Sequence, residues 1–207
     1  MGGAASFRGE KGTTWDGGFR VPMLLRWPGK VPAGAWSGEL MTGEDWLPTL
    51  LAAAGDPNVK ADLLKGKVVG ATTYKVHLDG YDQTEMLTQP RGKSKRREFF
   101  FFGESDLNAV RVDQWKIHVA TKDKWLDEAK KIPGGLLIDI KADPFERTPD
   151  TGGQFLWMKE KTWILPQLAG PIRAFVQSMQ DFPPSQKGAG LGASEVLGNL
   201  ANKPADD

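Results

Sequence analysis

A series of short apolar segments after residue 97 restricts this chain to a fold that contains an antiparallel sheet. Residues 98–102 hold four consecutive phenylalanines, as a buried strand does. The alternating segments 109–112 and 115–119 flank Asp113-Gln114 and predict a hairpin, and residues 136–140 predict a further strand. The connections are short, so antiparallel pairing is expected. The side chains expected to point largely inward are Val110, Val112, Trp115, Ile117 and Val119.

A helix is expected over residues 46–54. Apolar residues recur there at helical spacing, and Pro48 fits a first turn, where backbone N–H groups have no partner within the helix. Glu44 or Asp45 is therefore expected at or near the N-cap, where a carboxylate faces the positive end of the helix. The expected apolar stripe consists of Trp46, Leu47, Leu50, Leu51 and Ala54.

A second helix is expected between Pro166 and Met179. Pro166 suits a first helical turn, whereas Gly170-Pro171 interrupts the pattern and predicts a kink or a later start near Gly170. Pro183-Pro184 ends the helix, and residues 183–207 are expected to form a loosely packed tail. The apolar stripe of this helix consists of Leu168, Ile172, Phe175, Val176 and Met179.

The segment Val21–Trp27 is apolar almost throughout and ends at Pro28-Gly29, a turn signal. Its length and its flanks predict a strand buried on both faces, as in a parallel or mixed sheet. Pro22 fits only near the start of such a strand, because it has no N–H for the ladder. A strand of this kind needs neighbours on both edges, and residues 1–97 offer few others like it.

Composition and charge argue against several classes of function. Lys plus Arg is 27 and Asp plus Glu is 26, so the net charge is +1, without the basic excess of a nucleic-acid-binding protein. No stretch approaches the roughly 18 consecutive apolar residues of a membrane span. The N-terminus has no apolar core of signal-peptide length. The absence of cysteine excludes disulfides, thiolate metal sites and cysteine nucleophiles.

Several polar and aromatic residues are candidates for a chemical role, but they form no catalytic or metal-binding motif. His77 and His118 lie in different predicted segments and are interpreted as structural or surface residues, without metal-ligand spacing. The 8 tryptophans are expected to pack in the core. A basic cluster is interpreted as a solvated linker, with a phosphate or nucleic-acid site as the alternative. This cluster consists of Arg91, Lys93, Lys95, Arg96 and Arg97.

One segment does carry a specific pattern, Phe7-Arg8-Gly9-Glu10-Lys11-Gly12-Thr13-Thr14-Trp15-Asp16-Gly17-Gly18-Phe19-Arg20-Val21-Pro22. It closely resembles the motif that follows the metal-binding Asp-Asn-Gly of type I sulfatases, the arylsulfatase family of the alkaline-phosphatase superfamily. In that motif a Gly-x-Lys precedes Thr-x-Trp/Tyr-Glu/Asp-Gly-Gly-x-Arg-Val-Pro. The likeness continues, in order, through residues 26–30, 45–51, 74–81, 111–116 and 182–187.

The resemblance implies an α/β enzyme that hydrolyses sulfate esters. Family members use a formylglycine, made from Cys or Ser in a Cys/Ser-x-Pro/Ala-x-Arg motif, whose hydrated aldehyde attacks sulfur. A divalent metal, usually Ca²⁺, neutralises the sulfate oxygens, and Lys and His residues complete the charge clamp. The implied substrates are sulfate-ester small molecules or sulfated glycans, and the implied compartment is periplasmic or extracellular.

The chain departs from the family pattern at the catalytic centre. It has no Cys, none of its serines begins a Ser-x-Pro/Ala-x-Arg sequence, and the paired aspartates and Asp-Asn-Gly that bind the metal are absent. Lys11 alone matches an active-site position, as a catalytic and substrate-binding residue, and no metal ligand is assigned. The resemblance therefore predicts a C-terminal portion of a sulfatase that is inactive alone. The alternatives are a non-catalytic binding module and a related phosphatase-superfamily hydrolase, of which the run from Gly9 to Gly18 disfavours the second.

The expected fold class is α/β, with an α+β C-terminal part. Residues 1–97 are expected to form the end of the mixed-sheet α/β core that the resemblance implies. Residues 98–182 are expected to form a small antiparallel sheet with a packed helix, and they look more self-contained. Residues 183–207 are the expected tail.

Overall fold

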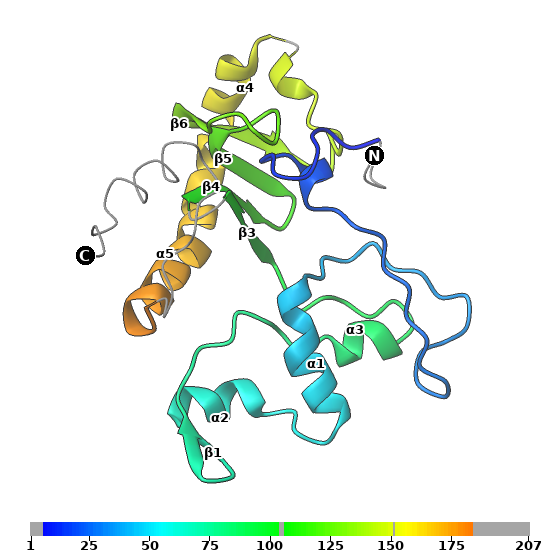
Figure 1. Ribbon diagram of the computed structural model, residues 1–207. Coiled ribbons are helices and arrows are strands. Elements are labelled where there is room, and N and C mark those ends of the chain that lie inside the picture. Colours follow the sequence, from blue (N-terminus) through cyan, green and yellow to red (C-terminus); the bar gives the residue numbers. More distant parts are fainter. Residues whose placement is uncertain (1–5, 104–105, 151, 184–207) are drawn as a thin grey trace, which may run out of the picture. The chain divides into compact units, whose positions relative to one another are not determined.

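The computed structural model describes residues 6–103, 106–150 and 152–183, which combine helices with antiparallel sheets, as the expected α/β class requires (Figure 1). The chain divides into two compact units. The sheet unit contains the described residues within 6–23 and 98–175, and the helical unit contains residues 24–97 and 176–183. Residues 6–23 thus group with the sheet, in contrast to the expected grouping of residues 1–97.

Four antiparallel strands form the sheet unit, and they confirm the strands and the hairpin expected after residue 97. The turn between the two hairpin strands contains Asp113, whose φ of 51° is the left-handed conformation that a tight hairpin turn needs and that aspartate tolerates. The strands follow the order β3 (Glu98–Gly103), β4 (Asp106–Val112), β5 (Trp115–Thr121) and β6 (Lys130–Asp139).

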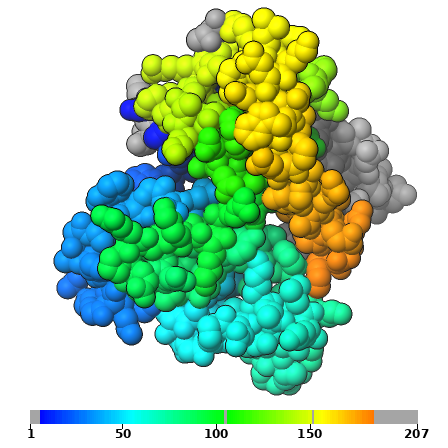
Figure 2. Space-filling model, turned by 180° about the vertical axis from the view of Figure 1, so that it is seen from behind, coloured from blue at the N-terminus to red at the C-terminus, as the bar shows by residue number. Residues whose placement is uncertain are grey.

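Apolar side chains on one face of the sheet form the larger core of this unit. Three helical elements lie along that face: α4 (Gln154–Glu160), η4 (Thr162–Ile164) and α5 (Leu165–Asp181). In Figure 2 the residues of α4 and the first turns of α5, in yellow, form a ridge beside the green strands. The buried residues at the centre of this core are Val110, Val112, Leu137, Ile164 and Leu168.

Helix α5 is the second helix expected from the sequence. It begins at Leu165, so Pro166 lies in its first turn as expected, and the alternative start near Gly170 is wrong. Pro171 is accommodated inside the helix, where stacking of Phe175 on Phe100, with ring centroids 3.9 Å apart, fixes the helix to the sheet. Within the described residues, no helix has the length and apolarity needed to cross a membrane. The expected tail, from residue 184 onward, lies outside the described residues.

The opposite face of the sheet is also buried, because residues 7–20, here called the motif loop, lie across it. Trp15 packs with Ile138 and Ile140, and the ring of Phe19 meets Phe101 edge-on with centroids 4.8 Å apart. The motif loop contains one short 3-10 helix, η1 (Asp16–Gly18). The segment that contains the glycines and the tryptophan of the sequence motif therefore covers one face of the sheet.

Burial on both faces changes the expected pattern of strand β5. Lys116 and His118, on the face opposite Ile117, are fully buried rather than solvated. Val119, expected to point inward, is exposed, and this expectation is wrong because the β5–β6 register shifts between His118 and Ala120. Alternation along a strand assigns side chains to two faces, but it does not say whether a second layer covers the polar face.

The expected strand at Val21–Trp27 is not formed. These residues have no ladder partner among the described strands, and Val21 and Leu24 are 82% and 100% exposed. Among described residues 24–97, strands β1 (Lys67–Val69) and β2 (Thr72–Tyr74) pair with each other. A strand requires a neighbour for its backbone hydrogen bonds, and none of the described strands pairs with this segment.

The helical unit contains the first helix expected from the sequence, α1 (Trp46–Ala53), preceded by η2 (Gly43–Asp45). Asp45 precedes Trp46, and Pro48 lies in the first turn, as expected. The expected apolar stripe is partly wrong, since Leu47 and Leu50 are exposed while Pro48 and Thr49 are buried. Two short helices complete the unit, α2 (Val59–Lys65) and α3 (Thr84–Thr88).

Candidate functional site

The candidate site is built on the motif loop, whose tight path depends on its glycines. The N–H of Gly17 donates to the carbonyl of Arg8 at 2.7 Å, which brings the two ends of the loop together. A Cβ at Gly17 would lie 2.5 Å from the carbonyl oxygens of Arg8 and Gly9, so only glycine fits at this backbone crossing. The N–H and the hydroxyl of Thr13 both donate to the carbonyl of Glu10, which closes a turn around Lys11.

The chain segment after β5 holds the other side of the motif loop. The N–H of Thr14 donates to the carbonyl of Lys122 at 3.3 Å, and the N–H of Lys122 donates back to Thr14 Oγ1 at 3.1 Å. The indole N–H of Trp15 donates to Asp123 Oδ1 at 2.8 Å. The turn that carries Lys11 is therefore attached to the sheet by backbone and side-chain bonds alike.

A buried cluster of charges fixes the second half of the motif loop. Lys116 Nζ lies 2.9 Å from Asp16 Oδ1 and 2.8 Å from Glu146 Oε1, and all three side chains are buried. The backbone N–H of Asp16 donates to Glu146 Oε2 at 2.6 Å, and Glu146 Oε1 also lies 3.0 Å from Nε2 of His118. Since buried ions need partners, this closed set explains why a lysine is tolerated in a core.

The charges of this cluster determine the protonation of its members. Burial by itself raises the pKa of Asp16, but Lys116 and Arg20 outweigh burial and hold that pKa below the ordinary value of 3.8. Burial lowers the pKa of His118 below the ordinary 6.5, although the hydrogen bond to Glu146 opposes this effect. Asp16 is therefore ionised and His118 neutral at pH 7, and the His118 ring serves structure, as expected.

The described residues do not fit a divalent metal. Among them, no group of three or more His, Asp or Glu side chains is arranged to hold a metal ion. Asp16 and Glu146 do bring two carboxylates together, but the ammonium of Lys116 already lies between them. A cation added there would face a buried positive charge, so this cluster anchors the loop and does not bind a metal.

Lys11, the predicted site residue, lies on the exposed turn of the motif loop. Its expected alternative partners are engaged elsewhere: Asp16 pairs with Lys116 and Arg20, and the Glu10 side chain accepts from the N–H of Trp125 at 3.4 Å. Within the described part of the chain, Lys11 has no ion pair; its ammonium lies 4.9 Å from the centroid of the Trp125 ring. The structure thus presents a cation on an anchored loop, and no carboxylate of the described residues forms an ion pair with it.

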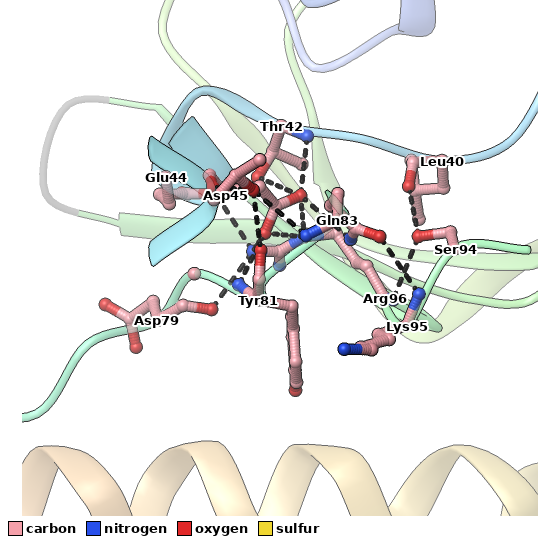
Figure 3. Close-up of polar contacts among 12 residues, drawn as sticks. Leu40, Thr42, Glu44, Asp45, Asp79, Tyr81, Gln83, Ser94, Lys95 and Arg96 are labelled. Atoms are coloured by element: carbon pink, nitrogen blue, oxygen red, sulfur yellow. Dashed lines mark hydrogen bonds and ion pairs between the residues drawn. The ribbon is translucent and has the colours of Figure 1, made fainter. Parts of the chain in front are cut away.

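Four of the five basic residues in the cluster at 91–97 are exposed, as the expected solvated linker requires, and the exception is Arg96. Arg96 is buried in the helical unit, and its guanidinium donates to both carboxylate oxygens of Asp45, with Nη2 lying 2.7 Å from Oδ1 (Figure 3). The carboxylate of Asp45 also accepts from the N–H of Thr42 and the N–H of Tyr81. These bonds hold the pKa of Asp45 below 3.8 against the opposing effect of burial. The paired charge of Arg96 is thus unavailable to a phosphate.

Sequence reasoning missed the partners that hold the motif loop. Lys116 and Glu146 lie 30 residues apart in the sequence and more than 95 residues from the loop, so no local spacing connects them. A signal was present in the alternation of β5, where a lysine and a histidine occupy one face of an otherwise apolar strand. Two such residues on one face indicate a polar layer when a second segment covers them.

Comparison with known proteins identifies relatives over most of the chain. The family model described as Sulfatase matches residues 1–56. Arylsulfatase A of Homo sapiens is 31% identical over 197 residues, which cover 87% of this chain and 35% of the relative. Arylsulfatase G of Rattus norvegicus is 29% identical over 197 residues, which cover 85% of this chain and 32% of the relative.

A solved structure shares the fold. The crystal structure of the PsFucS1 sulfatase from Pseudoalteromonas sp. matches with a TM-score of 0.68 and 26% sequence identity, covering 88% of this chain and 34% of that chain. The present chain therefore spans about a third of the length of the relatives that it matches.

Proposed function

We propose, since this chain belongs to the sulfatase family, that it forms the C-terminal part of an arylsulfatase-like enzyme that hydrolyses sulfate esters. Family membership suggests a metal cofactor, and we propose Ca²⁺ in the complete enzyme. The described residues do not provide its ligands. Substrates of the complete enzyme are proposed to be small sulfate esters or sulfated glycans.

The observation that carries this proposal is the placement of Lys11. Its ammonium stands on a turn closed by Thr13 and Glu10, and the loop behind it is fixed by the buried pairs of Lys116. Because the backbone that carries Lys11 is already fixed, anion binding has to order only the Lys11 side chain, so more of the attraction remains for the ligand. A sulfate group, with charge spread over its oxygens, is the anion that the family relationship supports.

The role proposed for Lys11 is electrostatic. As the ester bond to sulfur breaks, negative charge grows on the sulfate oxygens and on the leaving oxygen. An ammonium fixed beside them stabilises that charge most strongly where water is excluded. Lys11 does not supply the attacking group, and the 207 residues contain neither a cysteine nor a Ser-x-Pro/Ala-x-Arg sequence from which formylglycine is made.

Turnover of p-nitrophenyl sulfate by two proteins tests this proposal. The 207-residue chain alone is expected to give no turnover with or without Ca²⁺, because nothing in it attacks sulfur. The same chain joined to the formylglycine- and metal-binding segments of an arylsulfatase is expected to give metal-dependent turnover. Metal-dependent turnover by the purified chain alone, free of host sulfatase, would contradict its dependence on other segments. A folded joined protein that loads metal and formylglycine but turns over no sulfate ester would contradict the proposed activity.

A further inference from the structure

Trp125 lies beside Lys11, on the turn that follows β5. The centroid of its ring is 4.9 Å from Lys11 Nζ, and its backbone N–H points to Glu10 Oε1 at 3.4 Å. The turn is closed by the N–H of Asp127, which donates to the carbonyl of Lys124 at 3.1 Å. Trp125 is thus held against the motif loop both by its backbone N–H, which faces Glu10, and by its ring, which faces Lys11.

Gly12 allows this close approach. A Cβ at Gly12 would lie 2.5 Å from Trp125 Cδ1, and the φ of Gly12 is +83°, a conformation that residues with a side chain rarely adopt. Because Gly12 has no side chain, the indole of Trp125 packs directly on the turn that carries the cation.

The position leaves much of the ring uncovered. Trp125 is 47% exposed and its neighbour Leu126 is 94% exposed, whereas Trp15 of the same unit is buried. The sheet unit thus presents a cation and an apolar edge next to each other. An anion with an attached apolar group matches this pair of features better than a bare anion does.

We propose that Trp125 is a specificity-determining residue that contacts the organic group of the sulfate ester. The proposal rests on the proposed role of Lys11 in binding the sulfate. A sulfate at the ammonium of Lys11 places the ester oxygen, and the group beyond it, within reach of an indole less than 5 Å from that ammonium. Indole stacks on flat apolar faces, which an aromatic ring and the C–H face of a sugar both provide.

The alternative role of Trp125 is to stabilise the loop. A cation–π contact with Lys11 at an exposed site contributes modestly to loop stability whether or not a ligand binds. The two roles differ in one observable: a structural tryptophan affects all sulfate-bearing ligands equally, whereas a specificity residue discriminates between inorganic sulfate and an ester with a flat organic group.

The experiment is an NMR titration of the complete 207-residue chain. The indole N–H signal of Trp125, assigned by its loss in Trp125→Phe, is followed with inorganic sulfate, p-nitrophenyl sulfate and galactose 6-sulfate. We expect p-nitrophenyl sulfate to bind about three- to tenfold more tightly than inorganic sulfate, the scale of one aromatic contact. Tighter binding of galactose 6-sulfate instead would identify a sugar face as the preferred group and would equally support the proposal.

Variants separate the two claims; in them the amide signals of the motif loop report both folding and binding, because the Trp125 variants lack the indole signal. Trp125→Leu should keep the affinity for inorganic sulfate and lose the preference for the ester, and Trp125→Phe should keep part of it. Lys11→Ala should lose binding of all sulfate-bearing probes, and Trp36→Leu, at another exposed tryptophan, should change nothing. A preference that persists in Trp125→Leu would overturn the role of Trp125 and leave that of Lys11. No binding of any probe to the unaltered chain would overturn both.

Discussion

At the scale of single residues, the sequence motif has two kinds of members. Lys11 and Gly12 belong to an exposed turn, whereas Trp15 and Asp16 are buried and hold that turn on the sheet. The resemblance to a family identifies Lys11 as a site residue, but it does not separate the exposed from the buried residues of the motif. The structure separates them, because it shows that the buried Asp16 is bonded to Lys116, a residue about 100 positions away. Asp16 therefore helps to position the turn that carries Lys11, although it is itself buried.

His118 should make stability depend on pH in a defined window. Its pKa is lowered in the folded state, so between that value and the ordinary 6.5 the unfolded chain binds more protons. The free energy of unfolding should therefore fall as the pH drops below about 6.5. Protonation would also give a proton to Nδ1, which is buried without a hydrogen-bond partner among the described residues.

Chemical denaturation of the chain and of His118→Gln between pH 7.5 and 5 measures this effect. The variant should show a smaller change in stability over this range, since the side chain that titrates is gone. The carboxylates of Asp16 and Asp45, whose pKa values are lowered, lose their contribution only when the pH falls below about 3.8, and they are common to both proteins. An equal pH slope in both proteins would show that His118 is not held neutral by burial.

At the scale of elements, the sequence predicted those parts of the fold that local pattern determines. The strands of the sheet unit and helix α1 follow from alternation, from helical spacing and from Pro48, all of which act within a few residues. The strand expected at Val21–Trp27 fails because its formation depends on a partner strand. The burial of Lys116 was also missed, because it depends on the motif loop that covers β5.

Arg96 illustrates how one such distant contact organises several segments. Its bonds to Asp45 and to the carbonyl of Asp79 connect the start of α1 with residues 79–83. Arg96→Met leaves a buried carboxylate without its cation, so the chain should lose about 3–5 kcal/mol of stability. Amide exchange should quicken at Tyr81 and Gln83, whose N–H groups donate to Asp45 and Thr49.

The matched control is Lys93→Met, which removes a basic residue of the same cluster. Lys93 is 81% exposed and pairs with Glu39, and an exposed pair of this kind contributes about 0–1 kcal/mol. Denaturation midpoints and hydrogen exchange compare the two variants directly. Similar losses for Arg96→Met and Lys93→Met would contradict the buried role assigned to Arg96.

At the scale of the whole molecule, stability should be uneven along the chain. Residues 110–112 lie on β4, between β3 and β5, where both faces of the sheet are covered, whereas residues 23–26 have no ladder partner among the described strands and carry exposed apolar side chains. Hydrogen exchange should therefore be slow at Val110–Val112 and fast at Met23–Arg26. Strong protection at Met23–Arg26, together with weak protection at Val110–Val112, would reverse this ranking and show that the segment has found a partner.

Lys11 is proposed to bind the sulfate group in the completed enzyme. The measurement that tests this role most directly is kcat/KM for p-nitrophenyl sulfate in the enzyme completed with formylglycine- and metal-binding segments. Lys11→Ala should lower kcat/KM by on the order of 10²-fold, the loss of one charge-stabilising donor, with thermal stability unchanged. Lys141→Ala, at an exposed lysine outside the motif loop, should leave kcat/KM unchanged. A Lys11→Ala enzyme within about threefold of its parent, well short of the loss expected from one such donor, would contradict the account.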